Sequence, residues 1–186
     1  ENHMALPVIS NQKMNDYLKE LGELAEIIRQ AVKLSGVRAV VALGWGQQEA
    51  KTKDANIFYV KSVPHDWLFP HMAGAVHHGG AGTTATSLRH ALPTLVVPFG
   101  GDQPFWAERV YAAGCGPKAI PRDKLTAENL AEGLRALISN PEYTRNAACI
   151  GEALRNEHGC ANAADLIEKA VWDWENGNPA QDVMNI

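Results

Sequence analysis

Apolar and polar residues alternate along the chain in blocks, and the spacing within each block predicts helices and strands in turn. Over residues 14–34, apolar positions recur at steps of three and four, which is typical of an amphipathic helix. Shorter and continuously apolar runs, bounded by glycine or proline, predict buried strands of a parallel sheet. The predicted strands are 36–43, 56–63, 74–78 and 93–99, with a short edge strand at the KAIP segment, 118–121.

The remaining blocks predict helices between and after these strands. A short helical turn is expected in DWLFPHM, and the later helices are expected at 83–91, 103–113, about 127–138, from Pro141, and 161–174. Thr126 begins the sequence TAEN, which predicts a helix cap. Because parallel strands need crossover helices, this alternation predicts an α/β, doubly wound, Rossmann-like sheet with helices on both faces.

The expected organisation is a single domain at 14–175 between two short flanking segments. Residues 1–13 are expected to hold a vector-derived remnant, ENHM, and a degenerate first strand at 6–9, while 176–186 form a polar tail. The net charge of −4 and the mixing of acids and bases argue against a nucleic-acid partner. No apolar run approaches the roughly 20 residues that span a bilayer. Three cysteines without metal-type spacing predict reduced thiols in a cytoplasmic protein.

The sequence HHGGAGTT lies between a predicted strand and a predicted helix. The first turn of a helix has unpaired N–H groups and a positive dipole end, and glycines let a phosphate approach the backbone. The candidate diphosphate-binding residues are His78, Gly80, Gly82, Thr83 and Thr84. The alternative is a glycine turn that only permits tight packing. The spacing matches neither the dinucleotide fingerprint nor a P-loop.

The sequence GGDQPFW follows the next predicted strand. Ligands of open α/β sheets bind at the carboxyl ends of the strands, so Asp102 and Gln103 are expected to face the same crevice as the glycine turn. A carboxylate accepts hydrogen bonds and an amide both donates and accepts, so this pair is a candidate for binding sugar hydroxyls. The alternative is that one of the two side chains only caps the following helix.

A third loop, SVPHDWLFP, holds the candidate base-binding residues Val63, His65 and Trp67. Backbone groups near Val63 and His65 are candidates for reading a base edge, and Trp67 either covers the base or packs against the domain. His65 and His71 have no acidic or cysteine partner at ligand spacing, so no metal site is expected. Three further tryptophans are expected to be packing residues: Trp45, Trp172 and Trp174.

Together, the motifs VPHDWLFP, HHGGAGTT, SLRHALPTLVVPF and GDQPFWAERV resemble the C-terminal domain of GT-B glycosyltransferases, in the branch of the sterol 3-beta-glucosyltransferases. The resemblance implies that this domain binds a nucleotide-sugar donor, commonly UDP-glucose, without a metal or other cofactor. By motif position, it implies contacts of His78 with the diphosphate and of Asp102 and Gln103 with the sugar. The implied reaction inverts the anomeric centre as an acceptor hydroxyl displaces UDP.

The chain also departs from the family's pattern. The general base and the pocket for a sterol or lipid acceptor belong to an N-terminal domain, so no catalytic residue is expected here and the chain alone is expected to be inactive. The first strand and its Gly-Ser loop are replaced by LPVISNQKM, and Thr86 stands where related plant enzymes have a ribose-binding Glu. The full-length protein is compatible with peripheral membrane association. The alternatives are a non-catalytic nucleotide or protein binding module and the donor-binding subunit of a two-chain glycosyltransferase.

Overall fold

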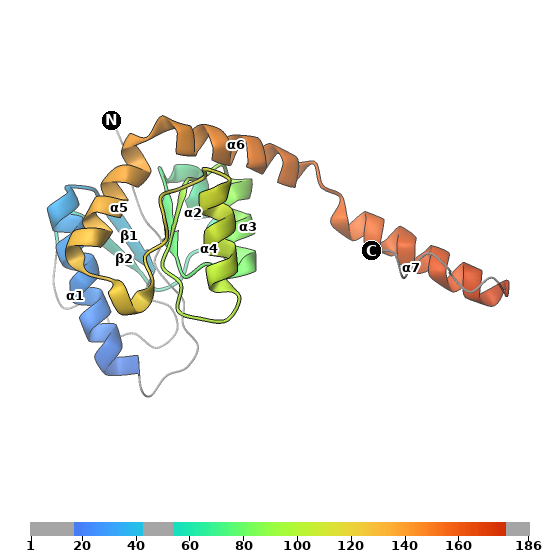
Figure 1. The fold of residues 1–186 in the computed structure, drawn as a ribbon, viewed down its shortest axis with the longest axis horizontal. Coiled ribbons are helices and arrows are strands. Elements are labelled where there is room, and N and C mark those ends of the chain that lie inside the picture. Colours follow the sequence, from blue (N-terminus) through green and yellow to red (C-terminus); the bar gives the residue numbers. More distant parts are fainter. Residues whose placement is uncertain (1–16, 43–53, 178–186) are drawn as a thin grey trace. The chain divides into compact units, whose positions relative to one another are not determined.

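A computed structural model describes residues 17–42 and 54–177 (Figure 1). The strands are β1 (Ala39–Ala42), β2 (Ile57–Val60), β3 (Ala75–His77) and β4 (Thr94–Val96). The helices are α1 (Tyr17–Ser35), α2 (His65–Leu68), α3 (Ala81–Arg89), α4 (Gln103–Ala112), α5 (Ala127–Ser139), α6 (Pro141–Arg155) and α7 (Gly159–Glu175), with 3₁₀ turns η1 (Phe69–His71) and η2 (Arg122–Lys124). The predicted first strand at 6–9, Trp45 and the tail from 178 lie outside the described residues.

The strands pair in parallel, as the alternation with helices predicted. In the described residues, β1 pairs with β2 and β3 pairs with β4, each as a two-stranded parallel sheet. The register of the second pair aligns Ala75 with Thr94 and His77 with Val96. Consequently, the carboxyl ends of β3 and β4 lie at the same edge, where their following loops start.

Helices cover both faces of the β3–β4 pair. Neighbouring residues of β4 point to opposite sides, so each packs against a different set of helices. Leu95 packs into a core shared with α1, α5, β1 and β2, whereas Val96 packs into a second core formed with α3, α4 and α6. In Figure 1, α1 and α5 lie on one side of the strands and α3 and α4 on the other. The prediction of an α/β sheet with helices on both faces is confirmed.

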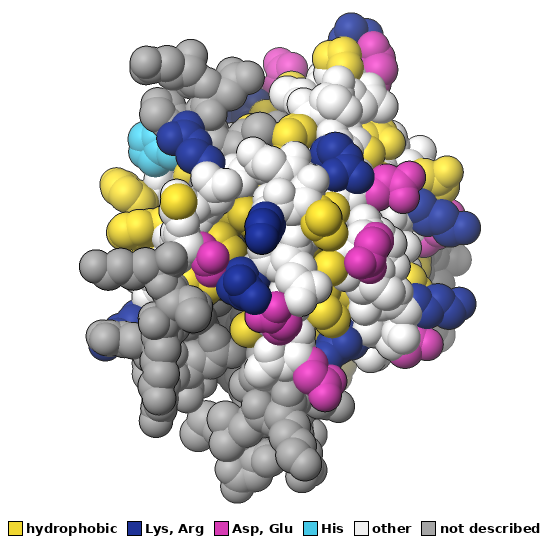
Figure 2. Space-filling view, turned by 90° about the vertical axis from the view of Figure 1, so that its left-hand side faces the viewer, with side chains coloured by type: hydrophobic (Ala, Val, Ile, Leu, Met, Phe, Trp, Pro, Cys, Tyr) yellow, Lys and Arg dark blue, Asp and Glu magenta, His cyan; other side chains and the backbone are white. Residues whose placement is uncertain are grey.

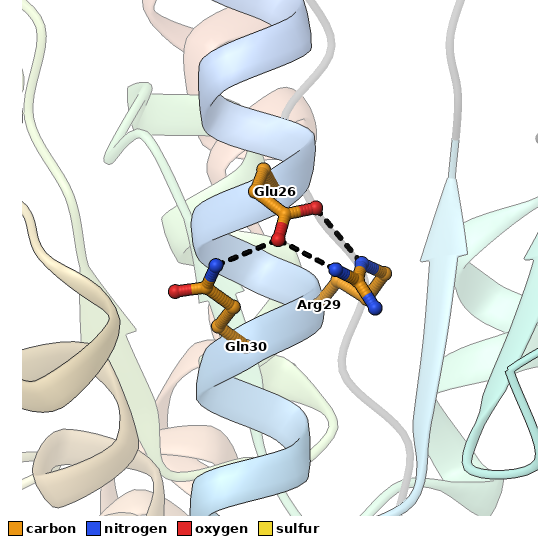
Figure 3. Close-up of polar contacts among 3 residues, drawn as sticks. All are labelled: Glu26, Arg29 and Gln30. Carbon is orange, nitrogen blue, oxygen red and sulfur yellow. Dashed lines mark hydrogen bonds and ion pairs between the residues drawn. The ribbon is translucent and has the colours of Figure 1, made fainter.

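The outer face of α1 carries a polar cluster that does not contribute to the core (Figure 3). Arg29 donates two hydrogen bonds to the carboxylate of Glu26, at 2.9 and 2.5 Å, and Gln30 donates a third at 2.6 Å. These spacings of three and four residues put the side chains on one side of the helix. The hydrogen bond from Arg29 is the main reason that the pKa of Glu26 is lowered.

The start of α5 confirms the predicted cap at Thr126, with Asn129 as its partner. The Thr126 hydroxyl accepts a hydrogen bond from the Asn129 amide at 3.3 Å, and the Asn129 side chain accepts one from the Thr126 amide at 2.9 Å. This reciprocal pair satisfies two N–H groups at the helix start. The cap therefore helps to fix where α5 begins.

The predicted edge strand at 118–121 is wrong. The segment lies along β4, with hydrogen bonds from Ile120 to the Val96 carbonyl and from Arg122 to the Pro98 carbonyl, each 3.1 Å long. Pro117 precedes the segment and Pro121 is its last residue, and neither proline has an N–H group to donate to a ladder.

The chain divides into two compact units, with the boundary between Leu154 and Arg155. In the second unit, Trp172 and Trp174 of α7 expose 60% and 79% of their surface. The expectation that these two tryptophans are packing residues is therefore wrong for the described chain. None of the helices among the described residues has the length and apolar character to cross a membrane.

Charged side chains of both signs are mixed on one face of the molecule (Figure 2). On the face shown in Figure 2, basic and acidic side chains lie among one another, and neither kind gathers into a continuous patch over the described residues. This distribution agrees with the balanced composition, in which 17 basic residues accompany 21 acidic residues. On this face, the described residues form no broad basic surface for a phosphate backbone.

Candidate functional site

The glycine turn after β3 and the loop after β4 meet at one edge of the sheet. The Val97 amide donates to the His77 carbonyl at 2.9 Å, which keeps the two strand ends together. Gly79 has a φ of +90°, and a Cβ added there would lie 2.5 Å from Val96 Cγ1 and 3.2 Å from the Gln103 carbonyl oxygen. Only glycine combines this backbone angle with such a close approach. The turn is therefore packed directly against the first residue of α4.

The turn leads into α3, whose first N–H groups have no side-chain cap. Gly80 is the N-cap residue and provides no side chain, and the first backbone bond of the helix runs from the Thr84 amide to the Gly80 carbonyl at 2.9 Å. The preceding amides of the first turn are the groups that lack intrahelical partners in any helix. Together with the helix dipole, they make this end of α3 favourable for an anion.

The His78 side chain lies over the start of α3. A Cβ added to Gly80 would be 2.6 Å from His78 Nε2, so the imidazole covers that glycine. The ring is half-buried, and its Nδ1 has no hydrogen-bond partner among the described residues. Burial lowers the pKa of His78, and the nearby negative charge of Asp102 offsets part of that effect. Burial therefore favours the neutral imidazole, and the charge of Asp102 favours the protonated one.

The other candidate phosphate-binding residues differ in their surroundings. Thr84 is buried, and its hydroxyl has no partner among the described residues. Thr83 is half-buried, and its carbonyl accepts a hydrogen bond from Ser87 at 3.0 Å. A Cβ added to Gly82 would meet no side chain and no atom outside its own helix turn within 4 Å, so this glycine faces open space. Gly82 thus leaves room for a ligand, whereas Gly79 is needed by the fold.

Asp102 and Gln103 both make contacts that leave part of each side chain available. One Asp102 oxygen accepts a hydrogen bond from the Trp106 indole N–H at 2.9 Å. The Gln103 side-chain oxygen accepts from the amides of Phe99 and Gly100, at 2.7 and 3.2 Å. The alternative that Asp102 caps α4 is wrong, because its side chain makes no cap hydrogen bond. Among the described residues, the second Asp102 oxygen and the Gln103 –NH2 group make no hydrogen bond, so both remain candidates for contact with a ligand.

The candidate base-binding loop is held by aromatic contacts. His65 stacks on Phe69 with the ring centres 4.7 Å apart, and Trp67 meets His71 edge-on at 5.4 Å. Val63 packs against the core cluster that contains Phe69. Trp67 is 64% exposed, so the alternative that it packs into the domain is not supported. The exposed indole can therefore reach a ligand.

Two functional candidates were missed by sequence reasoning. His77, at the end of β3, is buried, and its Nδ1 accepts a hydrogen bond from the Gly79 amide at 3.0 Å. Trp106 holds Asp102, as described above. The available signal for Trp106 was its position four residues after Asp102, on the same side of a helix. No comparable signal separates His77 from its neighbour His78 in the sequence.

Within residues 17–42 and 54–177, no group of three His, Cys, Asp or Glu side chains is arranged as metal ligands. Burial of Cys115 raises the pKa of its thiol to about 11, whereas Cys149 and Cys160 are exposed. Cys115 is therefore protonated at neutral pH. The expectation of a metal-free site stays a prediction.

The structure is an α/β domain in which a candidate anion-binding turn lies beside a candidate sugar-binding pair. Residues 26–167 match the family model described as the erythromycin biosynthesis protein CIII-like, C-terminal domain. The chain belongs to this family, and the resemblance to the C-terminal half of GT-B glycosyltransferases is confirmed.

Individual relatives agree with this assignment. The chain is 42% identical over 146 residues to a sterol 3-beta-glucosyltransferase of Arabidopsis thaliana, covering 77% of this chain and 24% of the relative. It is 40% identical over 153 residues to a sterol 3-beta-glucosyltransferase of Kluyveromyces lactis, covering 78% of this chain and 12% of that one. The chain thus spans about a quarter or less of the length of these relatives.

Solved structures show the same fold. The glycosyltransferase of kitacinnamycin superposes with a TM-score of 0.72 at 25% identity, covering 89% of this chain and 43% of that one. The calicheamicin glycosyltransferase CalG4 gives a TM-score of 0.75 at 20% identity, covering 90% and 43%. In both cases the chain corresponds to somewhat less than half of the solved enzyme.

Proposed function

We propose that this chain binds UDP-glucose as the donor-binding half of an inverting glycosyltransferase, and that the acceptor is a sterol or related lipid hydroxyl. The observation that carries the proposal is the meeting of the two loops at one edge of the sheet, where Gly79 packs against Gln103. An uncapped helix start and an imidazole are thereby brought beside a carboxylate and an amide. The names of the sterol glucosyltransferase relatives support the substrate class.

In the proposed complex, the diphosphate lies at the start of α3. The first N–H groups of α3 donate to its oxygens, and neutral His78 donates from one ring nitrogen. The sugar extends to Asp102 and Gln103, whose free carboxylate oxygen and –NH2 group accept from and donate to its hydroxyls. The uracil ring is expected against the loop with Val63, His65 and Trp67.

The reaction proposed for the whole enzyme is a displacement at the anomeric carbon. The acceptor oxygen forms a bond to that carbon as the bond to the diphosphate oxygen breaks, and the acceptor proton passes to a base supplied from outside the described residues. Negative charge then develops on the departing UDP. Preformed N–H groups and His78 stabilise that charge, which is the usual source of a large rate effect.

Isothermal titration of the 186-residue chain with UDP, UDP-glucose and NAD tests the proposal. Binding of UDP and UDP-glucose but not of NAD is expected. His78→Ala should weaken both uridine ligands about tenfold or more, because a hydrogen bond to a charged group contributes about 1.5–3 kcal/mol. Asp102→Ala should weaken UDP-glucose more than UDP.

The matched controls replace residues of the same types in the second unit. His158→Ala and Asp165→Ala change exposed side chains of the segment after Arg155 and should leave both affinities unchanged. Equal binding of all three ligands, or of none, would contradict the proposed function. So would an effect of His158→Ala as large as that of His78→Ala.

A further inference from the structure

A buried polar network lies beneath the glycine turn and joins three elements. His77 ends β3, Ser87 lies within α3 and Thr94 begins β4, and all three side chains are at most 3% exposed. We propose that His77 is a positioning residue, whose buried imidazole fixes the Gly79 peptide and so holds the diphosphate turn in its binding shape. This inference rests on the proposed function, because it assigns a role within the same site.

The hydrogen bonds define one tautomer of the His77 ring. The Gly79 amide can only donate, so the Nδ1 that it contacts at 3.0 Å carries no proton. The proton is therefore on Nε2, which lies 3.2 Å from the Ser87 hydroxyl oxygen and donates to it. An imidazole that accepts at one nitrogen and donates at the other must be neutral, and no alternative arrangement satisfies both partners.

The Ser87 hydroxyl connects the His77 ring to the start of α3. It lies 3.0 Å from the carbonyl oxygens of both Thr83 and Thr84 and donates to this part of the helix. The Thr94 hydroxyl lies 3.2 Å from Ser87 Oγ and 3.2 Å from the Leu92 carbonyl. His77 thus connects the end of one strand, the first helical turn and the start of the next strand.

The Gly79 peptide is the part of the turn that His77 controls. With a φ of +90°, Gly79 redirects the chain from β3 toward α3, and it does so while touching Val96 and Gln103. Rotation of this peptide would move His78 on one side and the helix start on the other. Holding the Gly79 N–H therefore sets the geometry of the groups proposed to meet the diphosphate.

Burial keeps the ring in the required state. Burial is the main reason that the pKa of His77 falls to about 3, so the ring stays neutral throughout the physiological range. Because it is 3% exposed and sits behind the turn, His77 has no route to the ligand itself. Its effect on binding has to act through Gly79.

Two isosteric substitutions separate the two functions of the ring. In His77→Asn, the side-chain oxygen takes the place of Nδ1 and still accepts from Gly79, but the donor to Ser87 is lost. In His77→Gln, the side-chain nitrogen takes the place of Nε2 and still donates to Ser87, but the acceptor for Gly79 is lost. His77→Leu removes both.

The affinities of the 186-residue chain and its variants for UDP and for uridine are measured by NMR titration. We expect His77→Gln and His77→Leu to lower UDP affinity about tenfold while leaving uridine affinity unchanged, because only the diphosphate contacts the turn. His77→Asn should recover most of the lost UDP affinity. A general loss of structure would instead lower both affinities together.

The outcomes separate this inference from the proposed function. Equal UDP affinities of the Asn and Gln variants, or parallel losses for UDP and uridine, would overturn the positioning role while leaving donor binding intact. A wild-type chain that binds neither ligand would overturn the proposed function and this inference with it. Hydrogen exchange of the Gly79 amide in the wild-type chain provides a check that needs no variant to fold, since rapid exchange there would also overturn the role of His77.

Discussion

The two ends of the candidate site are built differently. The turn after β3 is held from beneath by buried groups, with His77, Ser87 and Thr94 in one hydrogen-bonded network. The loop after β4 is held by contacts at the surface, where Trp106 bonds Asp102 and Gln103 bonds two backbone amides. Breaking a hydrogen bond of the first region leaves a polar group unpaired and away from water, which costs free energy, whereas the exposed contacts of the second region compete with water.

In the proposed complex, this difference gives the two ends separate roles. The preformed turn binds the part that every donor shares, which is the diphosphate. A loop whose contacts are exposed can adjust to the part that varies among donors, which is the sugar. The following predictions test this contrast, from the largest expected effect to the smallest.

Gly79→Ala tests whether the turn depends on its unusual backbone. A methyl group there would lie 2.5 Å from Val96 Cγ1, and the residue has a φ of +90°. Backbone strain and overpacking each cost about 1–3 kcal/mol, so the free energy of unfolding should fall by roughly 2–6 kcal/mol. Urea unfolding measures it, with Gly101→Ala as the control, because that loop glycine has a φ of +64° but open space around it. A loss no greater than that of the control would contradict close packing of the turn.

The buried ring of His77 makes stability depend on pH. Its pKa is about 3 in the folded protein, and burial of the ring is the largest cause. An unfolded histidine titrates near 6.5, so the unfolded chain binds the extra proton as the pH falls from about 6.5 to 3. Stability from this group is complete above pH 6.5 and is lost below it, by about 2 kcal/mol at pH 5.

Urea unfolding at pH 7.5 and pH 5 measures this dependence. His77→Asn is the control, since asparagine does not titrate and the variant should lose correspondingly less stability on acidification. An identical pH dependence of the two proteins would show that His77 is not held neutral in the folded state.

Gly82→Ala distinguishes a position needed by the ligand from one needed by the fold. An added Cβ there meets only open space, and alanine is favoured over glycine in a helix by up to about 1 kcal/mol. Stability should therefore stay the same or rise, while UDP affinity falls about tenfold because the methyl group occupies the approach of the phosphate. Gly22→Ala, another helix glycine facing open space, should leave UDP affinity unchanged. Undiminished UDP binding by Gly82→Ala would argue against a phosphate at this end of α3.

Trp106→Phe tests the exposed end of the site. Loss of the indole N–H removes the 2.9 Å hydrogen bond to Asp102 and lets the carboxylate rotate. A hydrogen bond at the surface competes with water and contributes about 1 kcal/mol, so UDP-glucose affinity should fall a few-fold with UDP affinity unchanged. Calorimetric titration of both ligands measures this, and an equal effect on both would contradict the assignment of Asp102 to the sugar.

The parts of the structure that follow from local patterns were predictable from the sequence. The α5 cap at Thr126 depends on residues within one helical turn, and the joint location of the glycine turn and Asp102 follows from parallel strands ending at one edge. The role of His77 was not predictable, because β3 is buried on both faces and alternation of side chains therefore carries no signal. In the segment at 118–121, the preceding Pro117 and the terminal Pro121 outweighed the apolar pattern.

Trp172 and Trp174 show a second limit of sequence reasoning. Large apolar side chains normally indicate packing, but both lie on α7 with most of their surface exposed. Exposure depends on what covers a helix, and a periodic pattern describes only the helix itself. The direction of the Gln103 side chain was not predictable either, because it is set by the amides of Phe99 and Gly100, which lie outside its own helix.

The uncapped start of α3 has a consequence for how the protein responds to its donor. A capping side chain stabilises a helix by about 0.5–2 kcal/mol, and Gly80 contributes none. An anion seated on those amides would serve as the cap, so the bound molecule would complete a secondary-structure element as well as occupy a pocket. Occupancy and the stability of the first turn of α3 would then rise together, so that the bound donor would add to the stability of a turn whose shape the buried network already holds.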